Sequence, residues 1–174
     1  MQQASKIFLI GFMGSGKSTR GRNLASLLGW SFIDIDENIE NLEGMSIPNI
    51  FSEKGEVYFR RIESEALRKT VSESKTVIST GGGTPCSGDN MDFMLTNGLT
   101  VYLKMNPSML LARLSKSPEK RPLLKDVDKK ELQDFITKKL EEREKWYSMA
   151  EITVDGSNTD ISYLYSLIKN RIRE

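Results

Sequence analysis

A glycine-rich loop near the N-terminus, Gly11–Thr19 with the sequence GFMGSGKST, constrains the fold more than any other part of the chain. It has the spacing G-x-x-x-x-G-K-[ST] of a phosphate-binding loop, follows the apolar run Lys6–Ile10, and opens a helical segment that ends at Gly29. Its glycines let backbone N–H groups surround phosphate oxygens, and the positive end of the helix stabilises the same anion. The position directly after a buried strand argues against a glycine-rich turn that matches by accident.

This loop predicts nucleotide binding. Lys17 would contact the β- and γ-phosphates of ATP, and the Ser18 hydroxyl would ligate Mg²⁺. The loop residues that we expect to bind the nucleotide are Gly14, Ser15, Gly16, Lys17, Ser18 and Thr19.

The composition excludes several classes of enzyme. The chain has 174 residues, a formal net charge of +1, one cysteine and no histidine. Without histidine there is no Ser-His-Asp type of triad, a zinc hydrolase is disfavoured, and Cys86 has no partner for a disulfide within the chain. The balanced charge, the lack of a signal peptide in residues 1–6 and the lack of a long apolar run lead us to expect a cytoplasmic protein. We expect no nucleic-acid partner and no membrane partner.

Short apolar runs with strand character alternate with helical patterns along the chain. The runs are Lys6–Ile10, Ser31–Ile35, Thr76–Thr80, Leu99–Lys104 and Glu151–Val154. This alternation predicts an α/β fold in which a parallel sheet is covered by helices on both faces and the crossovers are right-handed. A last helix is expected at 161–173. Ligands of such sheets bind at the carboxyl ends of the strands, and the polar motifs lie there.

Two aspartates close the second strand-like run. Residues two apart in a strand point to the same side, so Asp34 and Asp36 would leave the sheet together near the phosphate-binding loop. Asp34, nearer the sheet, suits Mg²⁺ bound through a water, whereas Asp36 suits a substrate hydroxyl. Alternatively, one of the two, such as Asp36, caps a helix that starts near Glu37.

A charged pair lies on the next predicted helix, which runs from about Glu56 to Ser72 after a shorter helix at 46–55. Glu63 falls inside the apolar stripe of this helix, and Arg60 lies at its edge three residues earlier. A carboxylate that faces the core is costly unless it is paired. Either the two residues form a structural pair, or Glu63 holds Arg60 rigidly so that its guanidinium binds an anionic group of a substrate.

Three consecutive glycines, Gly81–Gly83, follow the third strand-like run. Many phosphate-loop proteins place a Mg²⁺-binding aspartate near the end of a neighbouring strand, but Ser79 and Thr80 occupy that place here. This supports the metal role of Asp34. The glycines either allow a ligand to approach the backbone closely or form a tight turn before Pro85.

The helix predicted from about Asp128 to Tyr147 has a cation on its apolar face. The apolar residues of that face are Leu132, Phe135, Ile136, Leu140 and Tyr147. Arg143 lies in the middle of them, so it either pairs with a buried carboxylate or lines a pocket. Together with Arg60 it would form a carboxylate-binding site with two guanidinium groups.

The segment 114–126 precedes this helix. It is polar, contains two prolines and is rich in cations. It is either a mobile lid that closes over phosphates and excludes water, or an ordinary charged surface loop.

In combination these features resemble the shikimate kinase family. The matching motifs occur in the family's order over nearly the whole chain: Gly11–Thr19, Asp34-x-Asp36, Gly55-Glu56, Phe59-Arg60-Arg61-x-Glu63, Gly81-Gly82-Gly83, Arg121-Pro122-Leu123-Leu124, and Arg143 with Tyr147. The phosphate-binding loop alone is common to many proteins, whereas the combination is selective. The resemblance implies one kinase domain over residues 1–174 with a three-layer α/β/α fold, like that of nucleoside monophosphate kinases. Its five-stranded parallel sheet would have the order 2-3-1-4-5, with substrate-binding helices at about 36–73 and a lid at 114–126.

The resemblance also implies an activity, namely transfer of the γ-phosphoryl group of ATP to the 3-hydroxyl of shikimate on the route to chorismate and the aromatic amino acids. Mg²⁺ would be held by Ser18 and, through water, by Asp34. Asp36 would bind the ring hydroxyls and accept the proton of the 3-hydroxyl, and Lys17 and Arg121 would stabilise charge on the transferred group. Shikimate would be bound by Asp36, Arg60, Gly81, Gly82, Gly83 and Arg143.

Adenine recognition departs from the family pattern. The resemblance implies that Arg113 stacks on the base, but many members have a second arginine in the loop after the last strand, and residues 155–159 contain none. Arg113, the backbone and Asn158 would then hold the base. Other readings are a gluconate kinase-like or nucleoside monophosphate kinase, or a nucleotide-binding module without catalytic activity. We expect a monomer.

Overall fold

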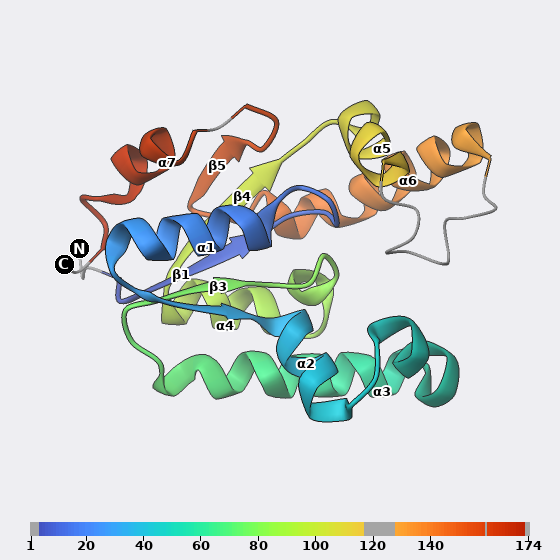
Figure 1. Cartoon of the computed structure of the whole chain (residues 1–174), viewed down its shortest axis with the longest axis horizontal. Coiled ribbons are helices and arrows are strands. Elements are labelled where there is room, and N and C mark those ends of the chain that lie inside the picture. The colour runs from blue at the N-terminus through green and yellow to red at the C-terminus, as the bar shows by residue number, and fades with distance from the viewer. Residues whose placement is uncertain (1–3, 117–127, 159, 173–174) are drawn as a thin grey trace.

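Five parallel strands form the central sheet of the protein, for which we describe a computed structural model covering residues 4–116, 128–158 and 160–172 (Figure 1). The strands are β1 (Lys6–Ile10), β2 (Ser31–Asp34), β3 (Thr76–Ser79), β4 (Leu99–Lys104) and β5 (Ile152–Asp155). Their order is β2-β3-β1-β4-β5, and every neighbouring pair is parallel. The predicted order and the predicted α/β class are therefore confirmed.

Helices connect the strands. They are α1 (Lys17–Leu28), α2 (Ile35–Glu43), α3 (Ile47–Lys69), α4 (Asn90–Asn97), α5 (Pro107–Ser115), α6 (Lys129–Tyr147) and α7 (Ile161–Ile168), with the 3₁₀ turns η1 (Thr70–Ser72) and η2 (Thr84–Cys86). Gly55, where the shorter helix predicted at 46–55 ends, interrupts α3 with a φ of 81°. The last helix is shorter than the predicted 161–173, because the chain leaves α7 to form a parallel bridge between Ile172 and Ala4.

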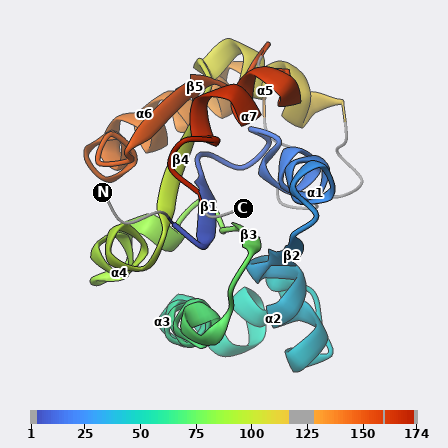
Figure 2. The ribbon, with the colours of Figure 1, turned by 90° about the vertical axis from the view of Figure 1, so that its left-hand side faces the viewer.

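The alternation of side chains along β1 divides the core into two layers. Ile7 and Leu9 pack with side chains of α1 and α7, whereas Phe8 and Ile10 pack with side chains of α3 and α4. Figure 2 shows α1 and α7 on one side of the sheet and α3 and α4 on the other. The sheet thus has buried residues on both faces, as parallel sheets do.

A third group of buried side chains joins α5 and α6 to the end of β1. Its members are Phe12, Met105, Leu110, Leu114, Leu132 and Ile136. Phe135 was predicted to lie on the apolar face of α6, but it is 46% exposed and takes no part in this group. Among the described residues, no helix has both the length and the apolar character needed to cross a membrane.

Candidate active site

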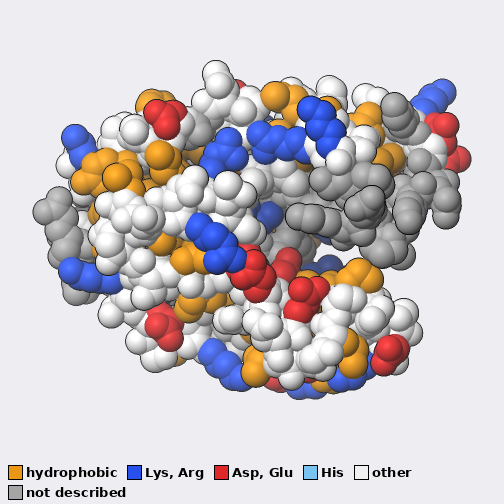
Figure 3. All heavy atoms as spheres, viewed as in Figure 1, with side chains coloured by type: hydrophobic (Ala, Val, Ile, Leu, Met, Phe, Trp, Pro, Cys, Tyr) orange, Lys and Arg blue, Asp and Glu red, His pale blue; other side chains and the backbone are white. Residues whose placement is uncertain are grey.

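The polar motifs meet at the carboxyl ends of the strands. β1, β2 and β3 end at Ile10, Asp34 and Ser79, directly before the segments that the sequence marked as functional. Figure 3 shows a hollow in the surface between the part that holds α1 and α5 and the part that holds α2 and α3, with acidic and basic side chains beside it. This is where ligands of open α/β sheets bind.

The phosphate-binding loop has the expected backbone. Gly14 and Gly16 have φ angles of 80° and 91°, values that side chains with a Cβ rarely adopt. Lys17, only 8% exposed, folds back over the loop, and its Nζ donates to the carbonyl oxygens of Gly11 at 2.8 Å and Phe12 at 3.0 Å. The loop therefore encloses its own cation at the start of α1, where a phosphate would bind.

The two candidate metal ligands contact each other. Ser18 Oγ donates to Asp34 Oδ2 at 2.6 Å, and Ser79 Oγ lies 3.4 Å from Ser18 Oγ. A hydroxyl and a carboxylate are hard oxygen donors of the kind that Mg²⁺ prefers. The part of the chain that the structure describes contains no cluster of three or more His, Cys, Asp or Glu ligands. Ser18 and Asp34 together offer two such oxygens beside the phosphate-binding loop.

Asp34 also caps α2. Its Oδ1 accepts hydrogen bonds from the backbone N–H groups of Asp36 at 3.0 Å and Glu37 at 3.3 Å. One of the two aspartates therefore caps a helix, as the alternative prediction held. The capping residue is Asp34 and not Asp36, and α2 begins at Ile35, two residues before the expected start near Glu37. β2 ends at Asp34, one residue before the predicted Ile35, because the Asp34 side chain accepts hydrogen bonds from the first N–H groups of α2.

Asp36, Glu63 and Gly81 are close neighbours. A Cβ atom on Gly81 would lie 2.6 Å from Glu63 Oε1, 2.8 Å from Asp36 Oδ1 and 2.9 Å from Thr84 Oγ1. Burial, followed by the nearby carboxylates of Glu63 and Asp34, raises the pKa of Asp36 to about 7, and the Lys17 ammonium opposes this shift. The Asp36 carboxyl is thus suited to exchanging a proton near neutral pH.

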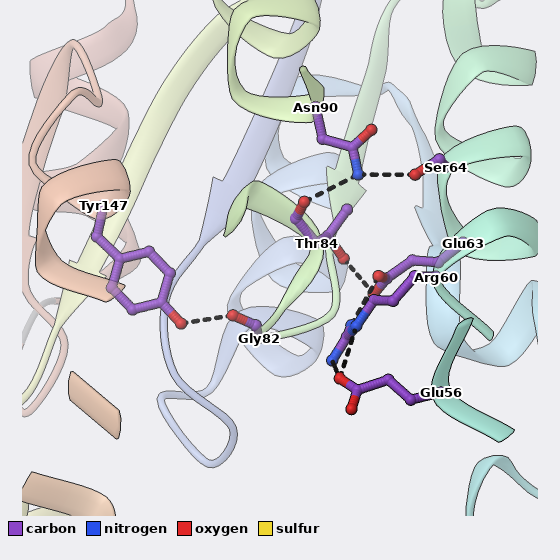
Figure 4. Close-up of polar contacts among 8 residues, drawn as sticks. All are labelled: Glu56, Arg60, Glu63, Ser64, Gly82, Thr84, Asn90 and Tyr147. Carbon is purple, nitrogen blue, oxygen red and sulfur yellow. Dashed lines mark hydrogen bonds and ion pairs between the residues drawn. The ribbon is translucent and has the colours of Figure 1, made fainter. Parts of the chain in front are cut away.

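Arg60 is held by two glutamates of its own helix (Figure 4). Its Nη1 donates to Glu63 Oε2 at 2.8 Å, and its Nε and Nη2 each lie 3.4 Å from Glu56 Oε1. Glu63 is 1% exposed, and its Oε1 accepts a 2.6 Å hydrogen bond from Thr84 Oγ1. The Arg60–Glu63 pair predicted from the sequence is confirmed, and it directs the guanidinium toward Gly83, where a Cβ would lie 2.6 Å from Arg60 Nη1.

The glycine turn is fixed from both sides. Asn90 Nδ2 donates to the carbonyl oxygen of Thr84 at 2.9 Å and to Ser64 Oγ at 3.1 Å, which links η2 to α3 (Figure 4). On the other side the Tyr147 hydroxyl donates to the carbonyl oxygen of Gly82 at 2.5 Å. These contacts fix the backbone of the glycine turn between α3 and α6.

Arg143 approaches the glycine turn from α6. Its guanidinium carbon is 5.4 Å from the centre of the Phe12 ring, and a Cβ on Gly82 would lie 3.4 Å from its Nη1. That Nη1 is buried and has no hydrogen-bond partner among the described residues. A buried donor of this kind is costly unless a ligand accepts from it. Arg60 of α3 and Arg143 of α6 thus approach the neighbouring residues Gly83 and Gly82.

The remaining predicted site residues are Arg113, Asn158 and Arg121. Arg113 Nη1 is 3.3 Å from the carbonyl oxygens of both Gly14 and Ser15, and its Nη2 is 3.4 Å from that of Gly156, so it lies beside the phosphate-binding loop. Asn158 is exposed in the loop after β5. Arg121 and most of the predicted lid at 114–126 lie outside the described residues.

Sequence reasoning did not identify three residues that contact the site, namely Thr84, Asn90 and Arg20, whose Nη1 donates to the carbonyl oxygen of Ser15 at 3.1 Å. Thr84 and Asn90 bond to residues of α3 more than 20 positions earlier, and no local pattern marks such contacts. Arg20 had a signal, because it lies one helical turn after Lys17 at the start of α1.

Comparisons with known proteins agree on one family. The sequence profile described as shikimate kinase matches residues 13–173. The chain is 45% identical over 151 residues to the shikimate kinase of Parabacteroides distasonis, an alignment that covers 87% of each chain. The crystal structure of shikimate kinase from Bacteroides thetaiotaomicron superposes with a TM-score of 0.90 at 37% identity, covering 94% of this chain and 98% of that one. The shikimate kinase from Acinetobacter baumannii in complex with shikimate gives a TM-score of 0.85 at 33% identity, covering 98% and 96%.

Proposed function

Because the chain belongs to the shikimate kinase family, we propose that it transfers the γ-phosphoryl group of ATP to the 3-hydroxyl of shikimate. The observation that carries this proposal is that Asp36, Arg143 and Arg60 approach the three consecutive residues Gly81, Gly82 and Gly83. This arrangement provides a carboxylate clamp and a proton acceptor at the carboxyl ends of the strands, where the phosphate-binding loop also lies. The related enzyme from Acinetobacter baumannii, solved with shikimate, supports the choice of acceptor.

The carboxylate of shikimate is proposed to bind between the two guanidinium groups. Arg60 has a fixed orientation from Glu63, and the buried Nη1 of Arg143 needs an acceptor. Charge-assisted hydrogen bonds from a planar guanidinium suit a carboxylate, since two parallel N–H donors match its two oxygens. The absence of side chains at Gly82 and Gly83 lets the two arginines approach the backbone, since a Cβ would lie 3.4 Å from Arg143 Nη1 on Gly82 and 2.6 Å from Arg60 Nη1 on Gly83.

Asp36 is proposed to bind the 3-hydroxyl and to take its proton. The hydroxyl oxygen then forms a bond to the γ-phosphorus while the bond from that phosphorus to the bridging β–γ oxygen breaks, which releases ADP. A carboxyl whose pKa is about 7 accepts a proton readily at neutral pH. Glycine at position 81 leaves the space that the Asp36 carboxyl needs, since a Cβ there would lie 2.8 Å from Asp36 Oδ1.

The phosphates of ATP are proposed to bind in the loop Gly14–Thr19, with Lys17 neutralising charge on the group that moves. Ser18 and, through water, Asp34 would hold Mg²⁺, which would supply positive charge that neutralises the phosphates. Arg113 is proposed to stack on adenine, and Asn158 to contact the base. The sequence motif alone assigns charge stabilisation to Arg121.

This function is tested by measuring acceptor-dependent release of ADP. The protein is mixed with ATP and Mg²⁺ and assayed with shikimate, quinate, gluconate, AMP or no acceptor. Release that depends on shikimate supports the proposal. Release with gluconate or AMP in place of shikimate would overturn the acceptor, and binding of ATP without any acceptor-dependent release would favour a non-catalytic module.

A further inference from the structure

Two guanidinium groups from different helices meet beside the phosphate-binding loop. Arg20, on the first turn of α1, donates from Nη1 to the carbonyl oxygen of Ser15 at 3.1 Å and from Nη2 to that of Gly156 at 2.8 Å. Arg113, on α5, reaches the same two carbonyl oxygens at 3.3 and 3.4 Å. The two cations therefore share both acceptors, and each connects the phosphate-binding loop to the loop after β5.

The side chain of Arg20 lies against the phosphate-binding loop. A Cβ atom on Gly16 would lie 2.5 Å from Arg20 Nη1 and 3.4 Å from Arg113 Nη1. Both nitrogens thus lie against the backbone that leads into α1, beside the loop in which the phosphates are proposed to bind. Arg22, two residues further along α1, points elsewhere and pairs with Glu37 on the exposed surface.

The loop after β5 forms the other boundary of this region. Gly156 is buried, and its N–H donates to the carbonyl oxygen of Lys104 at 2.7 Å, which fixes the loop to the end of β4. Asp155 accepts from the N–H of Ser157 at 2.8 Å, so the loop is also closed upon itself. Residues 155–159 contain no arginine, and the planar cations here come from α1 and α5.

The electrostatics favour a ligand against these cations. Partial burial and the nearby Arg113 cation both lower the pKa of Arg20, while the Asp155 carboxylate opposes them. Two like charges at short range repel each other, and the face of an aromatic ring is a favourable neighbour for a guanidinium plane because cation–π attraction adds to stacking. A purine base meets this requirement.

We propose that Arg20 is a second base-binding arginine, which together with Arg113 forms the slot for the adenine ring of ATP between the phosphate-binding loop and residues 155–158. This inference rests on the proposed use of ATP and adds a residue to that site. Arg20 thus does more than connect two loops: it contributes affinity that depends on the base and not on the phosphates.

The test compares a ligand that has the base with one that lacks it. The affinities of the full chain for Mg-ATP and for inorganic tripolyphosphate are measured by calorimetry for wild type, Arg20→Met, Arg20→Lys and the matched control Arg22→Met. Methionine keeps most of the stem without the guanidinium, and lysine keeps the charge without the planar group. We expect both Arg20 variants to bind ATP about 5- to 10-fold more weakly with tripolyphosphate affinity unchanged, and Arg22→Met to match wild type.

Two results would overturn the inference. An equal loss for ATP and tripolyphosphate means that Arg20 only organises the phosphate-binding loop, and no loss for ATP means that it does not contact the nucleotide. If Arg20→Met does not fold, the same comparison is decided by Arg20→Lys. Failure of the wild-type protein to bind ATP contradicts the proposed function itself, which separates that failure from failure of the Arg20 assignment. In turnover, the KM for ATP should rise for both Arg20 variants while the KM for shikimate stays within 2-fold.

Discussion

Glu63 and Arg60 form an ion pair of 2.8 Å, one helical turn apart on α3, in which the carboxylate is 1% exposed and the guanidinium faces Gly83. The second carboxylate oxygen of Glu63 accepts from Thr84. Removing a buried carboxylate from water costs several kcal/mol, and these contacts offset that cost. The pair thus connects the stability of α3 to the orientation of a residue that we propose binds substrate.

Replacing Glu63 with Gln should weaken both properties. The amide keeps the size of the side chain but loses the charge that holds Arg60, so we expect the KM for shikimate to rise about 10-fold with a smaller change in kcat. The free energy of unfolding should fall by about 1 to 3 kcal/mol. Glu65→Gln is the control, because Glu65 forms an exposed pair with Arg61 on the same helix and should change stability by at most about 0.5 kcal/mol. Equal effects of the two substitutions on the KM would contradict this account.

Replacing Arg143 with Ala should affect substrate binding more than stability. Its buried Nη1 has no hydrogen-bond partner among the described residues, so the substitution breaks no hydrogen bond of that atom in the free protein. Loss of a charge-assisted contact of about 1.5 to 3 kcal/mol corresponds to a rise of roughly 10- to 100-fold in the KM for shikimate. The KM for ATP should stay the same, and Lys145→Ala, which alters an exposed cation of α6, should resemble wild type. An unchanged KM for shikimate would remove Arg143 from the carboxylate site.

Replacing Gly81 with Ala should lower activity by displacing the groups around it. The new Cβ would lie within 2.9 Å of oxygens of Glu63, Asp36 and Thr84, distances at which at least one of them must move. We expect kcat/KM for shikimate to fall at least about 10-fold, since small displacements of catalytic groups have large effects on rate. In Gly44→Ala nothing lies within 4 Å, but the φ of 65° strains the backbone, so that variant should lose stability without losing activity. The reverse pattern would argue against a crowded site.

Without bound nucleotide, the Asp36→Asn variant should be more stable than wild type, and this difference in stability should increase as the pH rises. The unfolded chain releases the Asp36 proton at about pH 4, whereas the folded protein retains it until about pH 7, so this residue lowers wild-type stability progressively across that interval. Asn does not titrate. The advantage of the variant should therefore be about 1.5 kcal/mol at pH 5 and approach its full value, at most about 4 kcal/mol, by pH 8.5.

Urea unfolding of both proteins at these two pH values measures the difference directly. A constant difference between the variant and wild type would show that Asp36 does not change its charge in this interval. The same variant should lose at least about 100-fold in kcat, because an amide cannot take the proton of the hydroxyl. Near-normal turnover would exclude a central role for Asp36.

Much of the fold and part of the site could be predicted from local patterns. The buried strand before the glycine loop, the alternation of strands and helices and the stop at Gly55 all depend on residues close in sequence, and each agrees with the structure. The Arg60–Glu63 contact was also predictable, since the two residues are one turn apart on a helix.

The errors and omissions have a common physical origin in contacts between distant segments. α7 ends early because Ile172 pairs with Ala4 across the whole chain, and Asn90 acts through Ser64 and the turn at Thr84. Phe135 looked like a core residue from its spacing, but spacing alone cannot tell how wide the covered face of α6 is. The oligomeric state, the cytoplasmic location and the roles of Arg121 and Asn158 stay predictions from the sequence.

The central claim is tested most directly by identifying the product. The protein is incubated with ATP, Mg²⁺ and shikimate, and the mixture is followed by ³¹P NMR with correlation to protons. We predict one new phosphate monoester for each ADP formed, coupled to the proton on C3 of shikimate, and no such signal with Asp36→Asn. Phosphate on another hydroxyl, or ADP accompanied only by inorganic phosphate, would contradict the proposed reaction.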